Sequence, residues 1–186
     1  MTVSPLTFVL GGENIPGLVY KMYIADRRDV LLFPQRKTSS AIGDKLTLDG
    51  NILLKPGRVW KCVEIISDTG KIIHQAVGFL KHKAYVNKLD FKLQKDKGSD
   101  EWFQKHLNFD GIILIREKSG RYRVFGDDDN GAKFESVEGI GGADIYDERS
   151  WIAQIVDKTG KIAPYYDGEI KLVNSSWSSA FSSAFS

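Results

Sequence analysis

Short apolar or alternating runs separated by glycine-marked turns fill most of this chain. Three of the turns share one chemistry: residues 67–71 are Ser-Asp-Thr-Gly-Lys, 117–121 are Glu-Lys-Ser-Gly-Arg and 157–161 are Asp-Lys-Thr-Gly-Lys. Glycine tolerates positive φ, and such a turn between two strand-like runs is typical of a short β-hairpin loop. The pattern therefore predicts three hairpins, which pair residues 59–66 with 72–79, 112–116 with 122–125, and 151–156 with 162–166.

The N-terminal half contains two further strand candidates, residues 18–24 and 30–33, joined by a polar turn. Pro34 ends the second candidate because proline cannot donate to a β-ladder. Residues 35–57 form the longest weakly patterned stretch, within which residues 47–54 could make a short strand pair. Long loops in compact domains are usually functional or disordered.

The pattern predicts one clear helix at residues 99–107. Ser99 is the expected N-cap, acidic residues occupy the first turn, and Trp102, Phe103, His106 and Leu107 form one apolar face. Before this helix, residues 87–93 alternate apolar side chains with lysines, as a half-buried strand does. We therefore expect one mainly β domain over residues 1–174 with a single helix.

The last residues, 175–186, form a low-complexity arm of serine, alanine and aromatic side chains. Trp177, Phe181 and Phe185 recur every four residues, so a helix would align them on one side. One interpretation is a disordered tail. The other is an arm that becomes ordered by laying its aromatic side chains on a neighbouring molecule.

Composition is ordinary for a soluble globular protein. The 186 residues fit one domain, with 42% hydrophobic and 27% charged residues. The net charge is only +2, from 26 basic and 24 acidic residues, so the chain as a whole does not attract anionic nucleic acids or membranes strongly. The N-terminus lacks signal-peptide features, and no apolar run approaches the ~20 residues of a membrane helix. We expect a soluble cytoplasmic product, in which Cys62 is a buried, inert thiol of a reducing compartment.

Charge is nevertheless segregated along the chain. Residues 81–123 hold eleven basic and six acidic residues, whereas residues 127–149 hold eight acidic and two basic ones. In a monomer these segments are two solvated faces. In a homo-oligomer, opposite patches on one protomer suit head-to-tail contacts that close into rings or stack into filaments.

Candidate chemistry is sparse. The three histidines, His74, His82 and His106, fall on different predicted elements without metal-ligand spacing. The acidic run 127–130 faintly matches a calcium loop, but Ala132 occupies the position where the sharp-turn glycine is needed. Residues 139–142, Gly-Ile-Gly-Gly, lack phosphate-loop spacing and precede acidic residues, so we interpret them as a flexible loop.

The order of motifs in the last third of the chain resembles the tail tube (major tail) proteins of bacteriophages that infect Bacteroidetes bacteria. The resemblance covers about residues 107–172. It consists of the strand 112–115, the glycine-marked hairpin at Gly120, Phe125-Gly126, the Gly-Ala-Lys-Phe segment 131–134, the Gly-to-Asp stretch 139–144, the strand 151–156 and the Pro-Tyr-Tyr-Asp-Gly segment 164–168.

This resemblance implies a β-sandwich, nearly a barrel, flanked by one helix. Six subunits would form a ring, and stacked rings would make the hollow tail tube of a virion assembled in the host cytoplasm. The partners would be further copies of the chain and other tail proteins (terminator, baseplate or sheath), with DNA passing through without specific binding. Neither catalysis, cofactor, metal nor membrane is implied.

The same resemblance suggests contact residues. The long loop would reach the next ring, with Gly43, Asp49, Asn51 and Pro56 as candidates, and the arm would contribute Trp177, Phe181 and Phe185. Asp127, Asp128 and Asp129 would face either the lumen or the adjoining ring. An acidic lumen would let DNA slide, because contacts to phosphates would otherwise hold it.

Three alternatives stay open from the sequence. A tail terminator or baseplate ring protein of the same fold would form one ring without stacking. A β-sandwich module that binds a small ligand or carbohydrate is favoured by the aromatic residues Trp60, Trp102, Trp151, Tyr165 and Tyr166. An enzyme has Asp127–Asp129 as its only candidate cluster.

Overall fold

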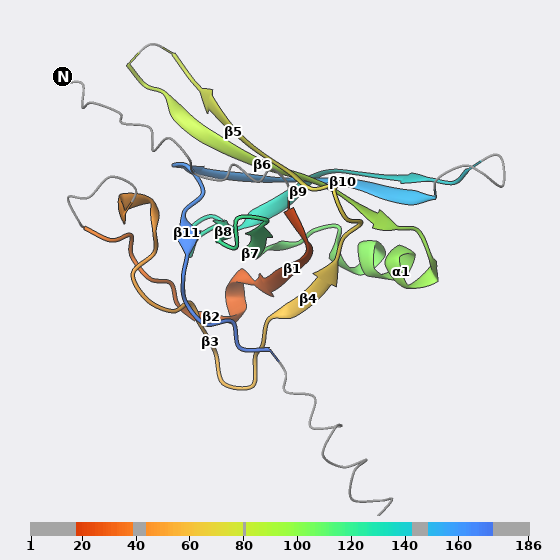
Figure 1. The fold of residues 1–186 in the computed structure, drawn as a ribbon, viewed down its shortest axis with the longest axis horizontal. Coiled ribbons are helices and arrows are strands. Elements are labelled where there is room, and N and C mark those ends of the chain that lie inside the picture. The colour runs from red at the N-terminus through yellow and green to blue at the C-terminus, as the bar shows by residue number, and fades with distance from the viewer. Residues whose placement is uncertain (1–17, 39–43, 80, 143–148, 173–186) are drawn as a thin grey trace, which may run out of the picture.

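A computed structural model of the chain describes residues 18–38, 44–79, 81–142 and 149–172. Its strands and its α-helix are labelled in Figure 1. In chain order the elements are β1 (Leu18–Asp26), η1 (Arg27–Asp29), β2 (Val30–Leu32), η2 (Asp44–Leu46), β3 (Leu53–Leu54), β4 (Lys61–Glu64), β5 (Lys71–Val77), β6 (Ala84–Gln94), α1 (Lys97–His106), β7 (Asp110–Glu117), β8 (Tyr122–Phe125), β9 (Ala132–Ile140), β10 (Ser150–Gly160) and β11 (Tyr165–Tyr166). The predicted mainly β fold with one helix is confirmed.

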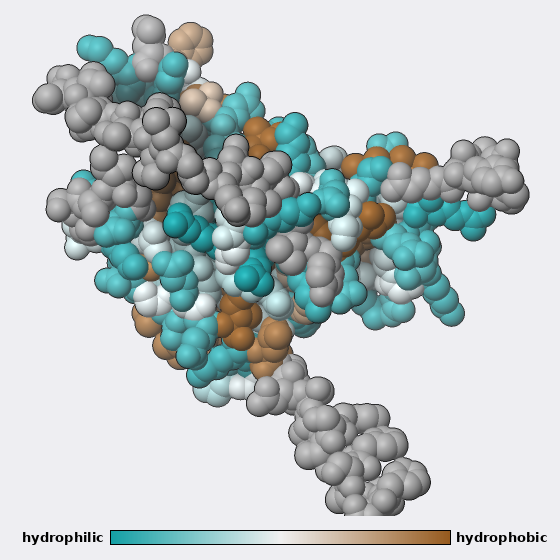
Figure 2. Space-filling view, in the orientation of Figure 1, coloured by the Kyte–Doolittle hydropathy of each residue, from teal (hydrophilic) through white to brown (hydrophobic). Residues whose placement is uncertain are grey.

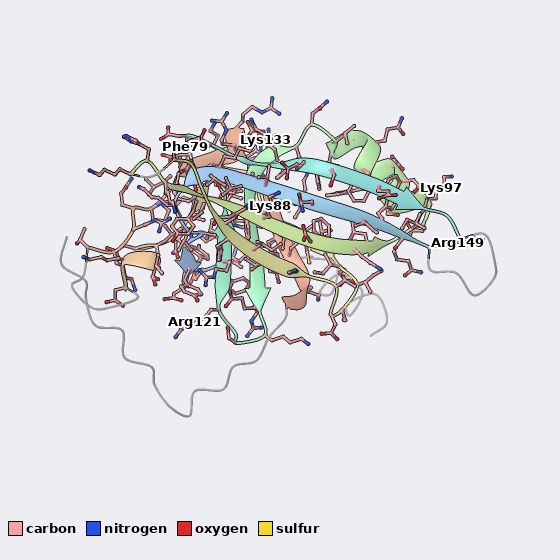
Figure 3. The ribbon with its side chains drawn as sticks, turned by 90° about the horizontal axis from the view of Figure 1, so that it is seen from above. Phe79, Lys88, Lys97, Arg121, Lys133 and Arg149 are labelled. Atoms are coloured by element: carbon pink, nitrogen blue, oxygen red, sulfur yellow. The ribbon has the colours of Figure 1, made fainter. Side chains whose placement is uncertain are left out.

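The strands form a nine-stranded antiparallel sheet that bends into two layers. The upper layer has the order β9-β10-β6-β5, and the lower layer has the order β11-β8-β7-β1-β4. In Figure 3 the upper strands cross those beneath them at a steep angle. The layers are joined where β7 begins, through the pairs Asp110↔Lys133 and Gly111↔Ala132. The result is sandwich-like. The described strands do not close a barrel, because β5 and β11, at the two ends of the main strand order, do not pair with each other.

Strand β7, in the lower layer, is buried on both faces. In β7, Ile113 and Ile115 point into the core between the layers, whereas Ile112 and Leu114 point into a second core on the far side. A strand buried on both faces needs a continuous apolar run, which is what residues 112–115 provide. The segment between β2 and β4 covers the second core, to which it contributes Leu48, Ile52 and Trp60.

The helix begins earlier than the pattern predicts. Asp96, not Ser99, is the N-cap: its carboxylate accepts a hydrogen bond from the backbone N–H of Ser99 (2.7 Å), while the Ser99 hydroxyl accepts one from the backbone N–H of Asp96 (2.9 Å). This is a capping box with Ser99 in its third position. Phe103 is buried as expected, but Leu107 is the C-cap and is 56% exposed.

Only one of the three predicted hairpins forms, the β7–β8 pair. β4 pairs with β1 instead of β5, and β5 pairs with β6. β10 continues through the predicted third turn as far as Gly160, and β11 pairs with β8. A glycine turn specifies a bend in the chain, but burial of the apolar faces decides which strands pair.

The N-terminal strands also find other partners than expected. After β1, the short η1 helix redirects the chain, so that β2 pairs with β3 in a small separate ribbon. Residues 47–54 do not pair with each other. Thr47 bridges to Tyr165 and Leu48 bridges to Arg36, so this segment closes over the second core.

Candidate functional site

The acidic loop between β8 and β9, residues 127–131, is a turn held by its first aspartate. Asp127 Oδ1 accepts hydrogen bonds from the backbone N–H groups of Asp129 (3.0 Å) and Asn130 (2.7 Å). An aspartate that bonds its own chain two and three residues on is an ordinary turn-forming device. The side chains of Asp128 and Asp129 are exposed, as is usual in a solvated acidic turn.

Arg27, about 100 residues earlier in the sequence, holds this loop in place. Arg27 Nη1 donates to the backbone carbonyls of Asp128 (3.2 Å) and Asp129 (3.3 Å). Its Nε and Nη2 donate to Asp110 Oδ2 at 3.3 and 3.1 Å. The guanidinium therefore ties the start of η1 to the loop and to the first residue of β7.

A polar cavity of about 200 Å³ separates the acidic loop from the beginning of the long loop. Arg36 lies in its wall, half-buried, and its Nη2 donates to the carbonyl of Ile162 at 2.7 Å. The other lining residues are Phe33, Pro34, Gln35, Leu48, Gly126, Asp127, Asp128, Asp129, Asp157, Thr159, Lys161 and Pro164. Among the described residues, no group of three or more His, Cys, Asp or Glu side chains is placed to hold a metal ion.

Beside this cavity lies a buried polar network centred on Asn87. Its Nδ2 donates to Asp157 Oδ2 (2.9 Å) and to the carbonyl of Lys161 (2.8 Å). Its Oδ1 accepts from the backbone N–H of Ala163 (3.1 Å) and lies 2.8 Å from His74 Nδ1. Because that oxygen is an acceptor only, His74 is the donor in this contact, and all four hydrogen-bonding positions of Asn87 are filled.

Burial shifts both titratable members of this network. Desolvation raises the pKa of Asp157, although hydrogen bonds from Thr159, Asn87 and Gly126 oppose the shift. Desolvation also lowers the pKa of His74, against the effect of its hydrogen bond to Asn87. Both shifts favour the neutral form, as burial of an ionisable group does.

None of the predictions from the sequence included this network, although the pattern carried a signal for it. Asn87 is the first inward position of a series that continues with Leu89, Phe91 and Leu93. Asp157 likewise follows inward Ala153 and Ile155 on β10, and both polar side chains are fully buried. A polar residue at an apolar position of a strand predicts a buried hydrogen-bond partner.

The candidate contact residues of the long loop are not gathered in one place. Asp49 is exposed, and its backbone N–H donates to the carbonyl of Gln35. Asn51 instead uses its side-chain oxygen to accept from the N–H of Glu169 (2.9 Å). Pro56 is exposed at a turn on the way to β4. Gly43 lies outside the described residues, as do the arm candidates Trp177, Phe181 and Phe185.

Other sequence predictions are corrected. Cys62 is exposed on β4, not buried, because its strand lies at the edge of the lower layer. Gly139 and Ile140 belong to β9 and not to a flexible loop: Gly139 pairs with Trp151, whose ring fills the space where a side chain would stand.

The upper layer presents two long unpaired edges. β5 pairs only with β6, and β9 beyond Lys133 pairs only with β10, within the part of the chain that the structure describes. The β5–β6 hairpin projects past the lower layer (Figure 1), and its turn carries Phe79, which is 87% exposed. Open strand edges are templates for pairing with another chain.

No described helix is long and apolar enough to span a lipid bilayer. Comparison with models of protein families, with curated proteins and with solved structures gives no match to this chain.

Proposed function

We propose that this chain is a structural virion protein without catalytic activity, which assembles into stacked rings that form the hollow tail tube of a phage. The observation that carries the proposal is the upper layer, a four-stranded antiparallel sheet in which, among the residues that the structure describes, β5 and β9 beyond Lys133 have open edges. The motif resemblance in residues 107–172 provides independent support.

The strand count of this layer suits ring closure. Neighbouring strands in β9-β10-β6-β5 alternate in direction, so β9 and β5 at the two edges run antiparallel to each other. If β5 of one copy lies beside β9 of the next, the junction is again antiparallel, and the same contact repeats around a ring. A head-to-tail contact of this kind closes when its rotation completes a circle.

A hexameric ring would enclose a channel. Six copies of four strands make a barrel of 24 strands. With strands about 4.8 Å apart and tilted about 40°, it would be roughly 45–50 Å across between backbones. Porin barrels of 16–18 strands already enclose water-filled channels, so the proposed ring leaves room for DNA.

The outward face of this sheet, which Figure 3 views from above, would line the channel. It carries lysines as well as carboxylates, including the pair formed by Lys88 and Glu135 (3.2 Å) and Asp90, which accepts from Gln154 (2.6 Å). The proposed wall is therefore mixed in charge and not acidic. The acidic loop stands where β9 begins, so in this arrangement it would lie at the rim and face the adjoining ring.

Negative-stain electron microscopy of the purified full-length protein tests the proposal. Rings or tubes are expected, whereas uniform monomers at high concentration would contradict assembly. Single rings that do not stack would indicate a terminator or baseplate role instead.

Two neighbouring proline variants provide a matched control. Along an antiparallel edge strand, N–H groups point alternately to the partner strand and to the open edge. Proline has no backbone N–H. One of the two variants Gln75→Pro and Ala76→Pro on β5 therefore loses a hydrogen bond to β6, whereas the other loses only an N–H group that points to the open edge. The variant that keeps its thermal stability should stay folded and fail to form rings. Normal rings from that variant would exclude the β5 edge as the contact.

A further inference from the structure

The β2–β3 ribbon presents an apolar surface to solvent. Leu31 is 61% exposed, Leu32 53% and Leu53 38%, and we refer to these three side chains as the leucine surface. Leu32 and Leu53 are paired in the ribbon, so their side chains lie next to each other. Hydrophobic residues gather at this lower part of the molecule in Figure 2. Clustered apolar exposure of this kind indicates a contact surface.

The described chain ends beside this surface. Leu172 bridges to Trp60, and the backbone N–H of Trp60 donates to the carbonyl of Lys171 (3.4 Å). A small cavity of about 80 Å³ lies between this last segment and β3, with Leu53, Trp60 and Lys171 in its wall. Whatever follows Leu172 therefore starts next to the leucine surface.

The sequence that follows has the chemistry to cover it. The arm, residues 175–186, has no charged side chain, although 27% of the whole chain is charged. Trp177, Phe181 and Phe185 would form one stripe of a helix, about 12 Å from first to last. Fully extended, the arm would reach about 40 Å, so distance does not limit the contact.

The N-terminal segment is less well placed. It joins β1 at Leu18, and β1 runs nine residues before η1 and β2 begin. Leu18, where this segment joins the domain, therefore lies about 26 Å from Asp26 along the strand. Position therefore favours the C-terminal arm as the occupant.

We propose that the C-terminal arm packs its aromatic side chains on the leucine surface of its own chain. Of the two interpretations open from the sequence, one laid the arm on a neighbouring molecule, but the place where the chain leaves the domain favours the same molecule. The proposal is independent of tube assembly, because it needs only one copy of the chain.

Disulfide trapping in the full-length protein tests this contact. Cys62, the only cysteine, is first replaced by serine. Leu32→Cys is then combined in turn with Trp177→Cys, Phe181→Cys and Phe185→Cys, and each pair is oxidised at low protein concentration. We expect at least one pair to form an intramolecular bond tenfold faster than the control pair Phe79→Cys with Phe181→Cys, since Phe79 lies on the β5–β6 turn. Equal rates, or bonds only between copies, would overturn the proposal.

Removal of the arm provides a second readout. Truncation after Asn174 should raise the binding of an apolar fluorescent dye several-fold. The same truncation should have no such effect when Leu31, Leu32 and Leu53 are all serine. An equal rise in both backgrounds would place the arm elsewhere, and a rise on deletion of residues 1–17 alone would assign the leucine surface to the N-terminal segment. Either outcome would contradict the proposal.

Discussion

The side-chain amide of Asn87 donates to the buried carboxylate of Asp157 across 2.9 Å, which joins β6 to β10 inside the sandwich. Neither residue has solvent-exposed surface. The same amide group also bonds to Lys161, and the Asn87 oxygen bonds to His74 and Ala163. One side chain therefore links three strands of the upper layer to the segment that leads into β11.

We predict that Asn87→Ala lowers the free energy of unfolding by roughly 2–4 kcal/mol, because it leaves buried polar groups without partners. Urea denaturation followed by far-UV circular dichroism measures the change. Asn108→Ala is the control, since Asn108 is exposed after α1 and its replacement should change stability by less than about 0.5 kcal/mol. Equal effects of both substitutions would show that the network contributes no net stability.

Asp157 should give stability a distinctive pH dependence. Burial raises its pKa in the folded state, so its contribution is fully present below the unfolded pKa of about 3.9 and is lost as the pH rises through the folded pKa. Asp157→Asn removes this titration. The variant should therefore gain stability relative to the wild type as the pH rises above about 4, in urea denaturation at a series of pH values. Parallel pH profiles would show that Asp157 has an ordinary pKa.

His74 should act in the opposite direction. Burial lowers its folded-state pKa, so its contribution is present above the unfolded value of about 6.5 and is lost as the pH falls through the folded pKa. His74→Gln keeps a donor for Asn87 but does not titrate. The stability advantage of the wild type over this variant should shrink as the pH falls below about 6.5. An advantage that grows on acidification would mean that the folded protein favours the charged imidazole. His82→Gln, at an exposed position, is the control.

A glycine in β9 provides a test of packing. A side-chain carbon at Gly139 would lie 2.8 and 2.9 Å from two ring atoms of Trp151, whose Nε1 donates to Asp100 Oδ1 (2.8 Å). Gly139→Ala must displace that ring and should cost about 1–3 kcal/mol, with altered near-UV circular dichroism. At Gly141 the nearest atom would be 4.0 Å away, so Gly141→Ala should have little effect. Similar stability of both variants would mean that the indole moves aside freely.

Local patterns predicted the elements better than their partners. The β7–β8 hairpin and the position of the helix, apart from its N-cap, followed from local spacing. The 67–71 turn shares with the β7–β8 turn the order of a hydroxyl residue, glycine and a basic residue, but it does not close a hairpin. Thr69 Oγ1 donates to the carbonyl of Ile66 and accepts from the N–H of Lys92, so this turn caps the end of β6. That difference depends on a residue 23 positions away, which local pattern cannot reveal.

The same limit applies to the candidate site. The acidic turn was predictable, because Asp127 bonds to residues two and three positions on. The polar residues Asn87 and Asp157 interrupt apolar series and could have been recognised from the sequence. The open edges of β5 and β9 could not be predicted from the sequence, because a strand edge is open only if no other strand pairs with it. They follow from the topology alone.

Arg27 provides the last prediction, for the acidic loop itself. It lies 83 positions before Asp110 and more than 100 before the loop carbonyls that it binds. Within the described structure, Asp110 Oδ1 is buried without a hydrogen-bond partner, so the guanidinium at Oδ2 is the principal stabilising contact of that carboxylate. Arg27→Ala should therefore lower stability by about 1–3 kcal/mol.

Hydrogen exchange distinguishes this anchoring from a general loss of stability. The amides of Asp129 and Asn130 should exchange faster in Arg27→Ala than global unfolding accounts for, because the loop loses two bonds to its carbonyls. Arg28→Ala is the matched control, since that side chain is 86% exposed and its ion pair with Asp26 is a surface contact worth little. Unchanged loop protection in Arg27→Ala would mean that the turn made by Asp127 holds the loop by itself.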